Sequence, residues 1–156
     1  MVLNRLVFKS SIGNSLNRKS EIILVFQIGN RQSTIGNFLV DANRLKSRTK
    51  AFSLEVLKFI EFLPNNTRGR AVGNQLVRSG TSVGANYRAV CRSRSKAEFI
   101  ARIGVVEEEA DESAFWLELI LESDLVPKDK AEPILKEANE LVAIMAASRK
   151  SAKNGK

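Results

Sequence analysis

Residues 99–120 read FIARIGVVEEEADESAFWLELI, and this stretch decides the fold. Its apolar and small residues alternate at spacings of four and three: Phe99, Ile103, Val106, Ala110, Ser113, Leu117 and Ile120. A seven-residue repeat sustained in this way is typical of a helix that packs along the seam of a left-handed bundle. Ser95 and Glu98 have the spacing of a capping box, which predicts that this helix begins just after Ser95.

The same periodicity predicts three further helices around this one. The first has an apolar face of Phe52, Val56, Phe59 and Leu63, and Pro64 ends it. The second begins near Thr67 and has an inner stripe of Val72, Leu76, Gly80, Val83, Tyr87 and Val90. The last has a stripe of Ile134, Ala138, Leu141, Met145 and Ser148. Four helices with short connectors predict an all-α, antiparallel, up-down-up-down four-helix bundle. We place it over residues 45–152, with a frayed tail at 153–156.

Two glycines, Gly80 and Gly84, lie in the middle of the second helix. Each costs about 1 kcal/mol of helix stability relative to alanine. They therefore predict either a close approach of this backbone to another helix or a local kink. Together with Tyr87 we assign them to helix packing.

Residues 1–44 follow a different pattern. Ile22–Phe26 and Thr34–Val40 flank Gly29-Asn30, which taken literally predicts a β-hairpin. An isolated hairpin is marginally stable in water, and no third strand is predicted downstream. We therefore expect residues 1–44 to be an N-terminal extension that is weakly folded or hairpin-like.

Two interpretations of this extension stay open. It is either a genuine mobile arm or an upstream extension of the reading frame with a mis-assigned start. The apolar run Ile22–Ile28 favours the second, because an unpaired apolar edge promotes aggregation. A shortened chain that begins near Asp41 is then expected to be at least as soluble, helical and oligomeric as the full chain.

Composition excludes most catalytic chemistry. The chain has no histidine and one cysteine, Cys91, which rules out Ser-His-Asp and Cys-His catalysis and leaves no usual zinc ligand set. The acidic run Glu107–Glu112 lacks the Glu-x-x-His motifs of paired-metal bundles, so we expect a solvated or salt-bridged face there. We predict no catalytic residue, no metal site and no cofactor. We expect Cys91 to fill space in the core.

The net charge of +8 is unevenly distributed. Residues 45–96 contain eleven Lys and Arg against two acids, whereas residues 97–156 contain eight against thirteen. The basic part can attract a polyanion, or it can pair with the acidic part of the same chain or of a neighbouring subunit.

Five cations along the second helix and the turn after it are candidates for binding phosphate: Arg78, Arg88, Arg92, Arg94 and Lys96. Only Tyr87 is near enough in sequence to stack on a base, so we expect binding without sequence specificity, to RNA or DNA. The alternative is a protein-interaction scaffold in which acids of the third helix or of another subunit neutralise these arginines. No apolar run is long enough to span a membrane, and the cysteine content fits a reducing, cytoplasmic location.

Several motifs resemble those of a known family. The run GNQLVRSGTSVGANYRA at residues 73–89 resembles a hallmark of the four-helix-bundle proteins encoded in intervening sequences of bacterial 23S ribosomal RNA genes. Four shorter runs match as well: SRSKAEFI at 93–100, EEADE at 108–112, WLEL at 116–119 and KEANEL at 136–141. The resemblance covers about residues 45–152 and leaves residues 1–44 outside it.

The resemblance implies an antiparallel four-helix bundle that assembles as a ring-like homopentamer. A protein similar in fold is the accessory protein of diversity-generating retroelements, a basic pentamer that binds nucleic acid and a reverse transcriptase. By analogy, RNA or DNA and a protein partner such as a reverse transcriptase are expected partners.

Overall fold

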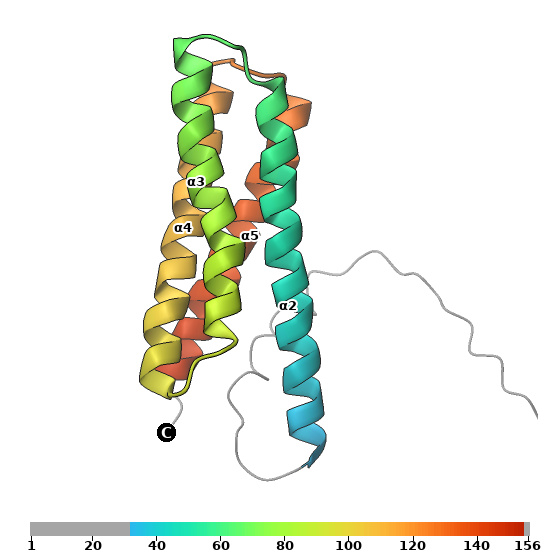
Figure 1. Ribbon diagram of the computed structural model, residues 1–156, viewed down its shortest axis with the longest axis vertical. Coiled ribbons are helices and arrows are strands. Elements are labelled where there is room, and N and C mark those ends of the chain that lie inside the picture. Colours follow the sequence, from blue (N-terminus) through green and yellow to red (C-terminus); the bar gives the residue numbers. More distant parts are fainter. Residues whose placement is uncertain (1–31, 155–156) are drawn as a thin grey trace, which may run out of the picture.

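The structure, a computed structural model, describes the backbone of residues 32–154 and the side chains of residues 42–154. Four long helices run alternately up and down, as Figure 1 shows. They are α2 (Gln32–Phe59), α3 (Thr67–Val90), α4 (Lys96–Glu122) and α5 (Lys128–Asn154), with a short 3₁₀ turn η2 (Ile60–Phe62) after α2. The prediction of an all-α, antiparallel four-helix bundle is confirmed.

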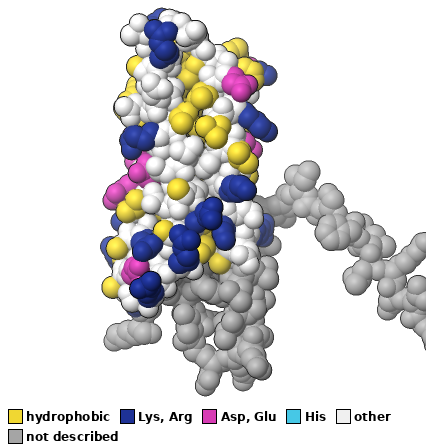
Figure 2. Space-filling view, in the orientation of Figure 1, with side chains coloured by type: hydrophobic (Ala, Val, Ile, Leu, Met, Phe, Trp, Pro, Cys, Tyr) yellow, Lys and Arg dark blue, Asp and Glu magenta, His cyan; other side chains and the backbone are white. Residues whose placement is uncertain are grey.

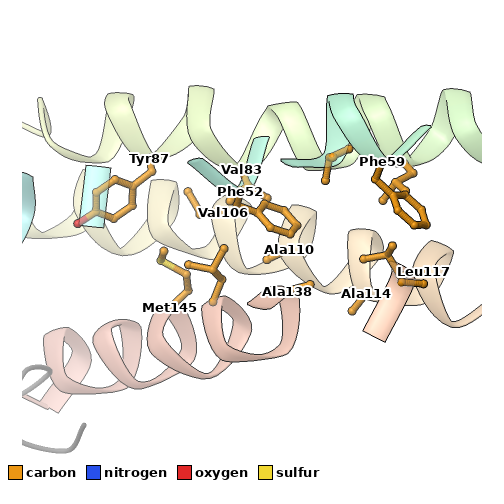
Figure 3. Packing of buried hydrophobic residues seen from close by; sticks show 14 of the residues in the cluster. Phe52, Phe59, Val83, Tyr87, Val106, Ala110, Ala114, Leu117, Ala138 and Met145 are labelled. Carbon is orange, nitrogen blue, oxygen red and sulfur yellow. The ribbon is translucent and has the colours of Figure 1, made fainter. Parts of the chain in front are cut away.

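The core is built from the predicted stripes (Figure 3). Each helix contributes residues that are nearly fully buried, among them Phe52, Val56, Phe59, Leu76, Val83, Ile103, Val106, Leu117, Ile120, Leu141 and Met145. Because these positions repeat at helical spacing, every helix presents one continuous apolar face to the others. In the described residues, α3 lies beside α2 and α4, and α5 lies beside α4 and α2.

The mid-helix glycines of α3 face α2. A Cβ at Gly80 would lie 2.8 Å from Val56 Cγ2, and one at Gly84 would lie 2.7 Å from Ser53 Oγ and 3.2 Å from the Thr49 carbonyl oxygen. Ser53 Oγ also donates to the Gly80 carbonyl at 2.8 Å. The glycines therefore allow close approach of two helices of the same chain, which is the first of the two alternatives that the sequence left open.

Four hydroxyl side chains are buried among the apolar residues: Thr49, Ser79, Ser113 and Ser148. Ser113 Oγ lies 3.0 Å from Ser79 Oγ across the α3–α4 interface, and Ser148 Oγ donates to the Ile144 carbonyl at 2.8 Å. Their hydrogen bonds satisfy polar groups that would otherwise be costly to bury. Small residues at these positions let the helices pack closely.

Local signals set the ends of α3 and α4. Asn66 caps α3 by accepting from the Gly69 amide at 2.9 Å, and Ser95 caps α4 by accepting from the Glu98 amide at 3.1 Å. The return bond of the predicted capping box differs in one detail, because Glu98 Oε2 accepts from the Arg94 amide and not from the Ser95 amide. The start predicted for α4 is confirmed.

A part-buried ion cluster joins α2 to α5. Arg48 donates through Nε and Nη2 to the two carboxylate oxygens of Glu137 at 2.7 and 2.8 Å, and Nη2 also reaches Glu140 Oε2 at 2.7 Å. A guanidinium held by two carboxylates fixes both distance and orientation. This contact ties the first helix to the last.

Two expectations about the chain ends need correction. Residues 34–40 are helical and form no strand, because α2 begins at Gln32 and continues without a break past Leu45. The partner strand at Ile22–Phe26 lies outside the described residues. At the other end, α5 continues to Asn154 and buries Ala152 completely, so the helix extends into the tail that we expected to be frayed.

We predict that Gly84→Ala lowers the free energy of unfolding by about 1–3 kcal/mol, because the added methyl group meets the α2 backbone, which cannot move aside. Gly104→Ala on α4 is the matched control, since its Cβ would meet only the flexible end of Arg149 at 3.3 Å. There the higher helix propensity of alanine dominates and the variant is neutral or more stable. Urea denaturation followed by circular dichroism measures both. Equal stability of the two variants would contradict this account of α3.

Candidate nucleic-acid interface

One end of the bundle carries most of the exposed cations. The antiparallel topology brings the first described turns of α2, the last turns of α3 and α5 and the first turn of α4 to the same end. Nine exposed Lys and Arg side chains gather there: Arg44, Lys46, Lys50, Arg88, Arg92, Arg94, Lys96, Lys150 and Lys153. We call these nine residues the basic end, and Figure 2 shows dark blue side chains over the lower half of the molecule.

Acids are scarce around the basic end. Residues 42–50, 85–102 and 146–154, which form it, contain a single carboxylate, Glu98. That carboxylate accepts from the Arg94 amide at 2.7 Å and pairs with Arg102 at 2.7 Å. The hydrogen bond from the Arg94 backbone and the nearby Arg102 lower the pKa of Glu98. The acid is therefore engaged locally, and cations far outnumber acids in these three ranges.

The turn between α3 and α4 is fixed by backbone hydrogen bonds. The amides of Arg92 and Ser93 donate to the carbonyls of Ala89 and Val90, each at 3.0 Å. Arg102 Nη1 reaches across from α4 to donate to the Ala89 carbonyl at 3.2 Å. These bonds hold the backbone that carries Arg92 and Arg94, and cations are favourable at the carboxyl end of a helix such as α3.

Cys91 lies at this turn and not in the core. It is the C-cap residue of α3 and is exposed, so the expectation of a buried space-filler is wrong. Its thiol is nevertheless partly shielded, and this burial raises the pKa of the thiol, against the opposing effect of Lys46. Lys46 on α2 thus acts electrostatically on the residue that ends α3.

Arg78 lies apart from the other four predicted phosphate-binding residues. It precedes Arg88 by ten residues, or about 15 Å along α3. Its guanidinium donates to Glu112 on α4 and lies 3.8 Å from Glu109 Oε2. The geometry thus brings Arg88, Arg92, Arg94 and Lys96 together and places Arg78 in an ion pair between helices.

The acidic run of α4 divides between two environments. Glu107, Glu109 and Glu112 face neighbouring helices, and Arg149 pairs with Glu107 at 2.9 Å. Burial raises the pKa of Glu109, and Arg78 opposes the rise. Glu108 and Asp111 point outward. Within residues 42–154 no group of histidine, cysteine or carboxylate side chains has the geometry to hold a metal ion.

Trp116 is half-buried beside the ion pair of Arg78 and Glu112. Its Nε1 donates to Glu112 Oε1 at 3.1 Å, and its ring contacts that of Phe115 edge to face at 5.1 Å between centroids. Hydrogen bonds from Arg78 and Trp116 lower the pKa of Glu112.

Sequence reasoning missed five members of the basic end: Arg44, Lys46 and Lys50 on α2, and Lys150 and Lys153 on α5. The runs RLKSRTK at 44–50 and SRKSAK at 148–153 are visibly basic. An antiparallel bundle brings the start of its first helix and the end of its last helix to the same end of the bundle as the end of the second. The predicted topology was therefore sufficient to find them.

The fold and this site define a class: a small antiparallel four-helix bundle with cations concentrated at one end. Residues 42–147 match the family described as 23S rRNA-intervening sequence protein. The match spans more than half of the chain, and the chain belongs to this family, which confirms the resemblance seen in the sequence motifs.

A solved structure supports the fold assignment. It is a protein with unknown function from the S23 ribosomal protein family of Bacteroides thetaiotaomicron, 28% identical, with a TM-score of 0.64. The alignment covers 70% of this chain and 97% of that chain. No curated protein matches the sequence. In the described part of the chain, no helix is both long and apolar enough to cross a membrane.

The Arg78–Glu112–Trp116 contacts predict an acid titration. The pKa of Glu112 is lowered in the folded state, so its ionised carboxylate stabilises the fold fully at pH values above the pKa that it has in the unfolded chain. This stabilisation is lost as the pH falls through the pKa of Glu112 in the folded state. Arg78→Ala removes the hydrogen bond that lowers the pKa of Glu112 most. The midpoint of the acid transition in Trp116 fluorescence should therefore move to higher pH. Arg68→Ala, an exposed substitution at the start of α3, is the control. Equal midpoints in the two variants would contradict the proposed coupling.

Proposed function

We propose that this protein is a non-enzymatic binding protein that holds RNA or DNA through phosphate contacts at its basic end. The observation that carries the proposal is the nine exposed cations, from four helices and the turn between α3 and α4, at an end where residues 42–50, 85–102 and 146–154 hold one carboxylate, which is already engaged. Each phosphate neutralised by a lysine or arginine releases counterions, and this release supplies most of the affinity of non-specific binding. Arginines in the rigid turn, Arg92 and Arg94, suit bidentate contacts to phosphate oxygens.

The surroundings of the basic end favour recognition of the phosphate backbone over the bases. The large exposed apolar side chains of the described residues are Leu54, Leu57, Phe62, Val105 and Phe115. All five lie outside the ranges that form the basic end, and Tyr87 is buried at 6% exposure. Sequence-tolerant binding of single strands uses exposed aromatic rings. Phosphate contacts without such stacking support binding that follows charge and not sequence.

The test replaces Arg88, Arg92 and Arg94 by alanine in the full chain. Nucleic-acid retention should weaken, and the slope of log affinity against log salt should flatten by up to about 3 units, because three phosphate contacts are lost. Fluorescence anisotropy with a labelled RNA at several salt concentrations measures both quantities. Far-ultraviolet circular dichroism must show unchanged helicity.

A matched control separates local contacts from net charge. Lys58, Arg68 and Lys128 are exposed at the opposite end of the bundle, so their replacement by alanine removes the same charge elsewhere. We expect this variant to retain most of the salt slope. Equal losses in the two triple variants would show that overall charge, and not the basic end, governs binding.

A second candidate function is a protein-interaction scaffold, and the pairing of Arg78 with Glu112 favours it. This ion pair shows that one of the five predicted phosphate-binding cations, Arg78, is neutralised within the chain. The exposed Leu54 and Leu57 on α2, at 49% and 41% exposure, supply apolar surface for an additional contact. Gly80 and Gly84 lend no support to assembly, because α2 of the same chain covers them.

We therefore expect a homo-oligomer, with the ring-like pentamer implied by the family resemblance as the specific form. Light scattering after gel filtration should return a multiple of the 17.3 kDa chain mass, and Leu54→Ser with Leu57→Ser should reduce it. A mass of one chain across micromolar concentrations would contradict this proposal and leave binding at the basic end unaffected. A protein partner such as a reverse transcriptase stays an analogy with the retroelement protein.

A further inference from the structure

The outer face of α4 is both acidic and apolar. Eight exposed residues at helical spacing lie on the side of α4 that is turned away from α3 and α5: Ala97, Ala101, Val105, Glu108, Asp111, Phe115, Glu118 and Glu122. We call them the α4 outer face. It combines two large apolar side chains, Val105 at 41% and Phe115 at 49% exposure, with four carboxylates and no cation.

These four carboxylates lack the partners that the inner ones have. Glu107 and Glu112 pair with arginines of neighbouring helices, whereas within residues 42–154 no ion pair involves a carboxylate of the α4 outer face. Glu118 and Glu122 also lie near the carboxyl end of α4, where negative charge is unfavourable. The α4 outer face is therefore matched to a surface that carries positive charge beside apolar side chains.

The outer face of α2 has this composition. Seven exposed residues at helical spacing lie along α2 and the turn η2: Ser47, Lys50, Ala51, Leu54, Leu57, Lys58 and Glu61. We call them the α2 outer face. It holds two lysines against one acid, and its two leucines are among the large exposed apolar residues of the described chain.

The two faces lie on opposite sides of the bundle. In the described residues α3 and α5 each pack against both α2 and α4, and Figure 1 shows α4 on the left and α2 on the right. One copy can therefore offer its α2 outer face to one neighbour and its α4 outer face to another. Such a contact is head-to-tail, and it repeats from copy to copy.

Contacts inside the bundle fix the relative level of the two faces. Val56 of α2 packs on Gly80 of α3, and Ser79, the residue before Gly80, meets Ser113 of α4. Val56 and Ser113 therefore lie at nearly the same level along the bundle axis. Because α2 and α4 run in the same direction, residues at equal distances along the chain from Val56 and from Ser113 also share a level.

This register aligns the apolar groups of the two faces. Leu57 follows Val56 by one residue, and Phe115 follows Ser113 by two. At 1.5 Å of rise per residue, their levels differ by about 3 Å at most. Two copies that lie side by side with parallel axes, and with no shift along the axis, thus bring these side chains to the same height.

The charged groups align in the same register. Lys50 precedes its reference residue on α2 by six positions, and Glu108 precedes its reference residue on α4 by five. Lys58 lies between the levels of Asp111 and Glu118. The same placement of two copies therefore brings each lysine of the α2 outer face within side-chain reach of a carboxylate.

Pairing of two like faces is less favourable. Contact between two α4 outer faces would bring four carboxylates of each copy together with no cation of either face, and like charges oppose such a contact. Contact between two α2 outer faces would leave the acidic and apolar surface of α4 uncovered. Charge complementarity thus favours contact between unlike faces.

We propose that the α4 outer face of one copy binds the α2 outer face of a second copy. Phe115 packs on Leu54 and Leu57, and the lysines of α2 neutralise the carboxylates of α4. Because the contact needs no displacement along the axis, its repetition can close into a ring without forming a rising filament. This pairing rests on the self-association proposed above and adds which two surfaces meet.

The first experiment disables one face at a time. Val105→Ser with Phe115→Ser disables the α4 outer face, and Leu54→Ser with Leu57→Ser disables the α2 outer face. Light scattering after gel filtration should give each variant alone the mass of one chain, 17.3 kDa. An equimolar mixture should give the mass of two chains, because it keeps one intact pair of faces. Circular dichroism verifies that these exposed substitutions leave the helices intact.

The second experiment reverses the charges. Glu108→Lys with Glu118→Lys should lower the mass of the assembly, and so should Lys50→Glu with Lys58→Glu. All four substitutions in one chain should restore the mass of the native protein, because opposite charges face each other again. A merely structural defect in either pair would add to the other and would not be rescued.

A matched control makes the same charge change outside both faces. Glu55→Lys with Glu132→Lys replaces two exposed carboxylates, one on α2 and one on α5. This variant should keep the mass of the native protein. Dissociation of the control to the same extent as the α4 charge variant would show that net charge, and not the α4 outer face, governs assembly.

The remaining outcomes separate this pairing from self-association itself. A native chain with the mass of one chain would overturn both, and it would leave binding at the basic end unaffected. A native assembly that persists in the α4 variants would overturn the pairing alone. So would a mixture of the two serine variants that stays at the mass of one chain.

Discussion

The close approach of α2 and α3 determines the arrangement of the whole basic end. The side chains of Val56 and Ser53 on α2 pack directly against the backbone of Gly80 and Gly84 on α3. A methyl group added at either glycine would come within 2.8 Å of them. A contact this tight fixes how far α2 is shifted along α3. It therefore fixes which residues of α2 lie beside the turn at 91–95, and it places Lys46 next to Cys91. The α3–α4 pair is set in the same way by Ser79 and Ser113, whose hydroxyl groups meet at 3.0 Å.

The sign of the exposed charge depends more on how far a residue lies along the bundle axis than on which helix carries it. In the sequence, the basic residues precede the acidic ones, which favours a division between the first two helices and the last two. In the structure, the carboxyl end of α5 contributes Lys150 and Lys153 to the same surface as α3. The acids of α4 from Glu107 onward lie progressively farther from that end. The antiparallel topology converts a gradient along the chain into a contrast between the two ends of the bundle.

The sequence was sufficient for the fold because each helix carries its own periodic signal. The stripes of α3 and α4, the cap at Ser95 and the stop at Pro64 all depend on residues within a few positions of one another. The pairing of Arg78 with Glu112 could not be predicted, because it depends on the relative shift of α3 and α4 along their axes. The beginning of α2 was missed for a different reason: residues 34–40 are rich in β-branched and aromatic residues, whose local preference does not favour helix. The exposure of Cys91 followed from where the last turn of α3 ends, which no local pattern specifies to within one residue.

Cys91 gives the basic end a built-in electrostatic reporter. It is the sole cysteine of the chain and it is exposed. Burial raises the pKa of its thiol, whereas the charges of Lys46 and Arg92 favour the thiolate. The rate at which a maleimide alkylates a thiol follows its thiolate fraction. Any polyanion that settles on the surrounding cations also neutralises the charges that stabilise the thiolate. The alkylation rate of one native side chain therefore records the local potential, without a label placed on either the protein or the nucleic acid.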